Sequence, residues 1–170
     1  GAEGYLPDDR PGRAEWCAAM LERLLQETGA RTVRLSLYWD EVEVREGAFD
    51  FSLSDALVQV AAMNNATVML SVGMKAQRHP EYYIPEWAMG EPHPVNGAVI
   101  SDDAALRERA LAFIAASVRH YSDEPAIDSW GAENEAYIAS HRAERYSLSR
   151  EYVAKVVETI RATDPLRRPV

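Results

Sequence analysis

The sequence has little cysteine, little basic charge and no long apolar run. Its 170 residues include one cysteine, Cys17, which excludes an internal disulfide and is expected to be a buried filler of a helix. Lys and Arg number 18 against 27 Asp and Glu, and the net charge of −9 argues against nucleic acid or an anionic membrane as partner. With no run of about 18 apolar residues, we expect no transmembrane span.

Patterns for metal, phosphate or nucleophile chemistry are also missing. The four histidines lie far apart, with no Cys, Asp or Glu at metal-ligand spacing. The sequence has no phosphate-cradling glycine loop and no Gly-x-Ser-x-Gly elbow. We therefore expect no metal and no cofactor. No signal segment opens the chain, so we expect a soluble protein, either cytoplasmic or secreted with its signal removed.

What the sequence does have is a regular alternation of apolar patterns. Period-3.6 patterns predict helices, and period-2 or continuous apolar patterns predict strands. The expected helices cover 13–28, 52–64, 104–121 and 150–163. The expected strands cover 32–39 and 66–72, and a third covers 127–135 with a polar tip at its end. Residues 1–12 resemble the end of an earlier strand. Residues 164–170 resemble the segment that leads into a later strand. This order predicts a single α/β domain over 1–170, with a parallel sheet and right-handed crossovers.

Helix-capping residues are expected at three of these helix starts. Ser52 or Ser54 can cap the second helix, and the run 101–103 can cap the third. Ser147 or Ser149 can cap the last helix.

The most informative strand ends in a polar tip. Its apolar start and Trp130 lead directly into Glu133-Asn134-Glu135, an amide between two acids. In α/β folds the carboxyl end of a strand is the functional end. We therefore expect the chemistry of this chain at that tip.

Two further segments carry unusual patterns. The segment 39–52 contains Trp39, Glu43 and Gly47 followed by Phe-Asp-Phe-Ser. The segment 74–100 is long, irregular and rich in aromatics, prolines and charges, and such loops in compact domains are usually functional.

Together these segments resemble the retaining glycoside hydrolases built on (β/α)8 barrels, including β-galactosidase-like and cellulase-like members. Trp130 with Glu133-Asn134-Glu135 is similar to the fourth-strand signature of that clan. The segment 39–52 is similar to its second-strand loop, and 74–100 to its third. The resemblance implies about half of a TIM-type barrel, from the end of strand 1 to the start of strand 5, because a complete barrel needs about 250 residues.

The resemblance implies hydrolysis of β-glycosidic bonds in an oligo- or polysaccharide, with retention. Glu135 would be the general acid/base, and Asn134 would bind the sugar 2-hydroxyl. Arg34 lies on the inward face of its strand, where an unpaired charge is costly, so we expect it to have an acidic partner such as Glu135. Trp39 either stacks on a sugar or packs in the core.

Three residues of the long loop, His79, Tyr82 and Trp87, are candidates for sugar contact. The alternative for each is to pin the loop to the barrel.

The clan's nucleophile is a Glu at the end of the seventh strand, and no residue here corresponds to it. Glu133 could mimic the second carboxylate, but it more plausibly holds Arg34 or a neighbouring strand. Gly131-Ala132 stand where the clan commonly has Gln-Val, and Ala136 stands where it commonly has Pro. These departures predict looser packing beneath the acid.

A half barrel would leave sheet edges and inward side chains in water. We therefore expect a homodimer, a complementary C-terminal half barrel, or a longer parent chain. The alternative function is a non-catalytic carbohydrate-binding or scaffold half barrel.

Overall fold

A computed structural model describes residues 12–78, 80–138 and 145–170. Within them, three strands form one parallel sheet in the order β1-β2-β3. The strands are β1 (Thr32–Ser36), β2 (Thr67–Val72) and β3 (Ile127–Ala132). This confirms the predicted α/β class with a parallel sheet. The predicted end of an earlier strand at 1–12 lies, except for Gly12, outside the described residues.

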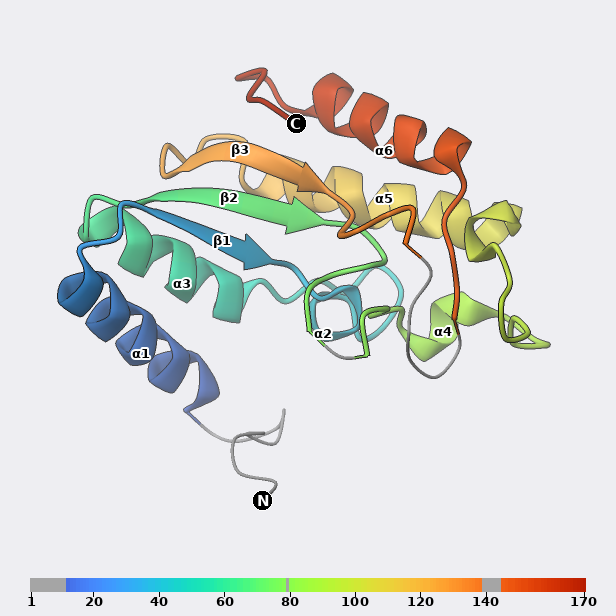
Figure 1. The fold of residues 1–170 in the computed structure, drawn as a ribbon, viewed down its shortest axis with the longest axis horizontal. Coiled ribbons are helices and arrows are strands. Elements are labelled where there is room, and N and C mark those ends of the chain that lie inside the picture. The colour runs from blue at the N-terminus through green and yellow to red at the C-terminus, as the bar shows by residue number, and fades with distance from the viewer. Residues whose placement is uncertain (1–11, 79, 139–144) are drawn as a thin grey trace.

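Long helices cover one face of the sheet (Figure 1). They are α1 (Arg13–Thr28), α3 (Ser52–Met63), α5 (Ala104–His120) and α6 (Arg150–Thr163). Helix α1 packs against α3, and α5 packs against α6. Three short elements lie between the strands and the long helices. They are α2 (Trp39–Val42), which follows β1, and α4 (Glu86–Met89) and the 3-10 turn η1 (Ile100–Asp102), which follow β2. None of the helices in the described ranges is long and apolar enough to cross a membrane.

The core lies between the sheet and the helices. The strands contribute apolar residues at alternate positions, because successive side chains of a strand point to opposite faces. Val68 and Leu70 of β2 are fully buried. The helices contribute residues spaced about one turn apart, Leu106, Ala110, Phe113, Ile114 and Val118 from α5 and Tyr152, Val156 and Ile160 from α6.

The opposite face of the sheet is open and polar. The register places Arg34 beside Met69 and Ser129, and the next row places Ser36 beside Ser71 and Gly131. Arg34 and Met69 are exposed. A parallel sheet with helices on its outer face and side chains on its inner face is the arrangement of a (β/α) barrel segment.

The first predicted strand is shorter than expected. It ends at Ser36, and Trp39 begins the single turn of α2 instead of ending the strand. Leu37 still donates to the Ser71 carbonyl at 3.0 Å, but Val42 then donates to the Tyr38 carbonyl and closes a helical turn. The alternation of apolar and polar residues continues past the strand end, so periodicity alone could not locate it.

The predicted caps are confirmed for two helices and wrong for one. Asp103 accepts from the Leu106 amide at the start of α5, and Ser149 accepts from the Tyr152 amide at the start of α6. At α3, the expected serine caps are wrong. The Asp50 carboxylate there accepts from the Ser52 amide at 2.9 Å.

The chain after α6 returns to the sheet. The Trp130 amide of β3 donates to the Pro169 carbonyl at 2.8 Å. The segment is not a strand, but this bond lies on the free edge of β3, where the predicted fifth strand would pair.

Candidate active site

A hollow of about 480 Å³ lies at the carboxyl ends of the strands. Strand β1 and the loops that follow β2 and β3 form its walls, and successive loops of a parallel sheet meet at this end. Three residues proposed from the sequence, Arg34, Asn134 and Glu135, lie here together. The full lining is Arg34, Ala76, Gln77, Arg78, Glu81, Asn134 and Glu135.

Arg34 reaches from β1 to Asn134 across the open face. Its Nη2 donates to Asn134 Oδ1 at 3.3 Å, and its Nε donates to the Ser71 hydroxyl at 3.1 Å. The Gln77 amide is satisfied when its oxygen faces the guanidinium, 2.8 Å from Nη1, and its nitrogen faces the Ser36 hydroxyl. The prediction of an acidic partner for Arg34 is therefore wrong. Its partners among the described residues are neutral, and solvent on the open face compensates its charge.

Glu135 has an exposed side chain on the wall of the hollow. In the part of the chain that the structure describes, its carboxylate has no hydrogen-bond partner, so both oxygens can meet a ligand. Its backbone is in the left-handed region, with φ at 45°, and so is that of Glu133, at 60°. Such a conformation costs a residue with a side chain about 1–3 kcal/mol, so surrounding contacts must hold the loop.

Glu133 lies beneath this loop, fully buried. Its Oε1 accepts from the Met74 amide at 3.0 Å and from the Tyr152 hydroxyl at 2.7 Å, and its Oε2 accepts from the Lys75 amide at 2.7 Å. Burial raises its pKa to about 7, against the lowering effect of these donors. Glu133 therefore ties the end of β3 to the end of β2, one of the two roles expected for it, and leaves no oxygen for a nucleophile.

Two glycines make room for this arrangement. A Cβ atom on Gly73 would lie 2.3 Å from the Glu133 carboxyl carbon, and one on Gly131 would lie 2.4 Å from the Ser71 hydroxyl oxygen. The looser packing predicted at Gly131 is therefore wrong. The missing side chain lets Ser71 stand beneath Arg34, so the strands are close-packed at this point.

Lys75 was not singled out from the sequence. Its side chain is fully buried, and its ammonium donates to the carbonyls of Glu135 at 3.1 Å and Ile138 at 2.7 Å. The Glu81 carboxylate lies 3.7 Å away. One signal could have found it: Lys75 is one of two lysines in the sequence, and it stands three residues after the end of strand β2, in the long loop predicted to be functional.

Trp39 lies in the core. Its side chain has no exposed surface, stacks on Phe113 with ring centroids 5.5 Å apart, and donates from Nε1 to the Glu43 carboxylate at 2.7 Å. A ring without exposed surface cannot stack on a sugar. This corrects the substrate-binding assignment of Trp39 in favour of its core-packing alternative.

The aromatic residues of the long loop make contacts that support the loop-pinning alternative. Trp87 donates to the Glu43 carbonyl at 2.9 Å, and Tyr82 donates to the Tyr146 carbonyl at 3.0 Å. Burial raises the pKa of Tyr82, helped by nearby Glu133. Both rings remain half-buried, so their sugar contact stays a prediction. His79 lies outside the described residues.

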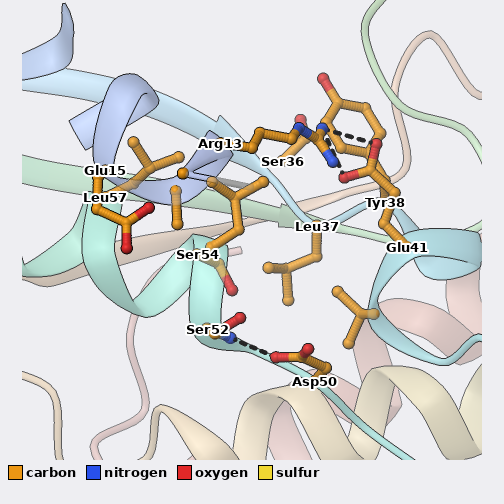
Figure 2. A pocket seen from close by; sticks show the side chains of 14 residues that line it. Arg13, Glu15, Ser36, Leu37, Tyr38, Glu41, Asp50, Ser52, Ser54 and Leu57 are labelled. Carbon is orange, nitrogen blue, oxygen red and sulfur yellow. Dashed lines mark hydrogen bonds and ion pairs between the residues drawn. The ribbon is translucent and has the colours of Figure 1, made fainter. Parts of the chain in front are cut away.

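A second hollow, of about 360 Å³, lies between the start of α1, the loop after β1 and α3 (Figure 2). Three of its four charged side chains, Arg13, Glu41 and Asp50, already have partners. Arg13 donates to both oxygens of Glu41 at 3.0 Å, and Asp50 accepts from the Ser52 amide. No residue of the β3 loop lines it, so it lacks the proposed acid and is not the candidate active site. Elsewhere in the described ranges, no three His, Cys, Asp or Glu side chains gather into a metal site.

Comparison with known proteins identifies the family. The glycoside hydrolase family 42 model, described as β-galactosidase, matches residues 5–164, nearly the whole chain. The chain belongs to this family. One similar protein is the β-galactosidase BgaA of Clostridium cellulovorans. It is 22% identical over 121 residues, which are 66% of this chain and 18% of that protein.

Solved structures share the fold. A GH5_18 protein of Streptomyces cattleya, solved with GlcNAc, superposes with a TM-score of 0.71 at 13% identity, over 98% of this chain and 42% of that one. The β-galactosidase of Rahnella sp. R3 gives a TM-score of 0.65 at 12% identity, over 89% and 32%. The family 42 chain thus forms part of a glycoside hydrolase (β/α)8 barrel, and it spans less than half the length of these relatives.

Proposed function

We propose that residues 1–170 are one domain, the N-terminal half of a barrel, that supplies the acid/base side of a retaining β-glycosidase active site. One observation carries the proposal. Glu135 presents an exposed carboxylate, unpaired among the described residues, at the carboxyl end of β3, beside the Arg34–Asn134 pair, in a chain of glycoside hydrolase family 42. A general acid must reach the leaving oxygen, and Glu135 is accessible from the hollow.

In the first step the Glu135 carboxyl gives its proton to the glycosidic oxygen. The bond between this oxygen and the sugar C1 breaks, and its electron pair stays with the oxygen of the leaving alcohol. A carboxylate from outside residues 1–170 attacks C1 and forms the glycosyl ester. In the second step Glu135 takes a proton from water, whose oxygen attacks C1 and releases that carboxylate.

Arg34 fixes the orientation of Asn134 for substrate binding. Its guanidinium occupies the amide oxygen of Asn134, so the amide nitrogen is the group left to bind the sugar. Asn134 is largely buried, which restricts its rotation. We propose that this nitrogen donates to the sugar hydroxyl next to C1, and that Gln77 supports the same arrangement.

The proposed substrates are β-galactosides, from the description of the family and of BgaA. The proposed partner is the remainder of a barrel, from the same chain or a separate one, or a second copy. Support comes from α1, where Trp16, Met20 and Leu24 form a stripe of exposed apolar side chains one turn apart. In a closed barrel, such a helix face packs against the neighbouring outer helix.

Substitution Glu135→Gln tests the proposal in the longest chain that carries this segment. Hydrolysis of a phenyl β-galactoside should fall by a factor of about 10²–10⁴, because glutamine cannot transfer the proton. Azide should restore turnover with an activated substrate by replacing water as nucleophile. Glu158→Gln, on the exposed face of α6, is the matched control and should leave the rate unchanged. Unchanged hydrolysis in Glu135→Gln would refute the acid/base role, and sugar binding without turnover in the parent would favour a non-catalytic protein.

A further inference from the structure

Lys75 is a buried cation with all its contacts at the candidate active site. Its side chain has no exposed surface, although lysine is almost never fully buried unless it is paired. Its ammonium has three oxygen neighbours, the carbonyls of Glu135 and Ile138 and the carboxylate of Glu81. It also lies 5.7 Å from the ring centroid of Tyr82. The two carbonyls accept hydrogen bonds from the ammonium, and the carboxylate at 3.7 Å pairs with its charge.

The main chain of Lys75 binds the same loop. Its amide donates to Glu133 Oε2 at 2.7 Å, and its carbonyl accepts from the Asn134 amide at 2.9 Å. Lys75 thus contacts three consecutive residues of the β3 loop, and through its ammonium a fourth, Ile138. Together with the Met74 amide, which also donates to Glu133, Lys75 joins the loop after β2 to the loop after β3.

These contacts act on a backbone that needs support. Glu133 and Glu135 are both left-handed residues with side chains, and such conformations persist only where neighbouring groups determine them. The Glu135 carbonyl accepts from both the Lys75 ammonium and the Ile138 amide, the latter at 2.9 Å. Holding this carbonyl restricts the ψ angle of Glu135 and so helps to keep its main chain in the left-handed conformation from which the side chain leaves the loop.

We infer that Lys75 is the positioning residue of Glu135. Its buried ammonium holds the Glu135 and Ile138 carbonyls so that the carboxylate stands in the hollow, beside Asn134. The inference rests on the proposed function of Glu135. Lys75 itself touches no substrate in this arrangement, since its ammonium is enclosed by the loop it holds.

The test compares Lys75→Met with wild type, both in the longest chain that carries this segment, on two substrates that differ in their need for an acid. Phenyl β-galactoside has a poor leaving group that must be protonated, and 2,4-dinitrophenyl β-galactoside has one that leaves without a proton. We expect kcat/KM of the phenyl substrate to fall about thirtyfold, and that of the dinitrophenyl substrate less than about threefold, because a displaced acid slows only the proton-dependent step. Lys155→Met, the same change on the exposed face of α6, is the matched control and should alter neither.

Hydrogen exchange provides a second readout that needs no activity. In Lys75→Met, the amides of residues 135–138 should exchange at least about tenfold faster, while the amides of α6 keep their wild-type rates. Where Lys75→Met fails to fold, Lys75→Gln, which keeps a donor group, is measured by the same substrate ratio and the same amides.

The outcomes separate this inference from the proposed function. A parallel loss on both substrates, or unchanged exchange at residues 135–138, would refute the positioning role while Glu135→Gln still abolishes proton-dependent hydrolysis. If the wild type hydrolyses neither substrate, or Glu135→Gln is fully active, the proposed function fails instead. A selective loss on the phenyl substrate, with faster exchange at the loop, establishes Lys75 as the positioning residue.

Discussion

At the scale of single residues, burial changes what a carboxylate does. Glu133 and Glu135 are two residues apart, yet one is enclosed by three donors and the other faces the hollow. Their left-handed backbone turns the strand into a loop between them, so they do not share a face as residues i and i+2 of a regular strand would. The tight fit of Gly73 against the Glu133 carboxyl group fixes the buried one in place.

The raised pKa of Glu133 predicts a pH dependence of stability. The folded-state pKa is about 7 and the ordinary value is 4.5, so between these values the folded protein binds the extra proton. The contribution of Glu133 to the free energy of unfolding is therefore largest below pH 4.5 and falls as the pH rises to about 7, by up to about 3 kcal/mol. In urea unfolding across this range, the unfolding free energy of the wild type minus that of Glu133→Gln should decrease as the pH rises.

Glu151→Gln, at an exposed position of α6, serves as the control for this prediction. Its unfolding free energy should follow that of the wild type at every pH. Parallel curves for wild type and Glu133→Gln would mean that the carboxyl group is ionised in the folded protein throughout.

At the scale of elements, the end of α6 is clamped to the start of β3. The Arg168 guanidinium donates three hydrogen bonds to the Asp164 carboxylate, at 2.7, 3.0 and 3.2 Å. It also donates to the main-chain carbonyls of Tyr121, Ser122, Glu124 and Ile127. Its guanidinium lies 5.1 Å from the ring centroid of Trp130. The hydrogen bonds from Arg168 lower the pKa of Asp164 to about 2. This clamp lies at the amino ends of the strands, away from the hollow, so its role is stability.

Arg168→Met should therefore destabilise the protein by about 3–5 kcal/mol, because it leaves the buried Asp164 carboxylate and several carbonyls without their donor. Thermal and urea unfolding measure the loss. Arg168→Lys should recover little of it, since an ammonium cannot reproduce the bidentate contact. The neighbouring exposed Arg167→Met is the control, and equal stability of the two methionine variants would show that the clamp contributes nothing.

At the scale of the whole molecule, the described sheet has one covered face and one open face. The open face carries Arg34, its cross-strand neighbours Met69 and Ser129, and the hollow. Helix α1 carries a separate stripe of exposed apolar side chains, Trp16, Met20 and Leu24. Burying such a stripe stabilises a contact by roughly 25 cal/mol per Å² of apolar surface.

We predict that residues 1–170 expressed alone associate through this stripe. Native mass spectrometry should show assemblies of the 19.0 kDa chain, with the dimer the smallest. Replacing Trp16, Met20 and Leu24 together by glutamine should shift the spectrum to monomer. The same number of glutamines at Glu15, Glu22 and Arg23, exposed polar positions of α1, should leave the assembly unchanged. A wild-type chain that stays monomeric at micromolar concentration would contradict this prediction.

The sequence by itself determined the order of strands and helices, because apolar periodicity reports which faces are buried whatever the neighbouring elements are. It also placed Glu133-Asn134-Glu135 at a strand end, since a buried strand must stop where charged residues begin. Motif spacing indicated the barrel and the resemblance to glycoside hydrolases, which the shared fold and the family match bear out.

Only the tertiary structure decided which side chains meet. Arg34 and Asn134 are 100 residues apart, and parallel pairing across β2 brings them within hydrogen-bond distance. The packing of loops from different strands likewise decides three other features. It buries Trp39, encloses Glu133, and brings the Lys75 ammonium to the carbonyls of the Glu135 loop. A linear pattern records the local burial preference of each residue but not its distant neighbours, and those neighbours set the chemistry of this site.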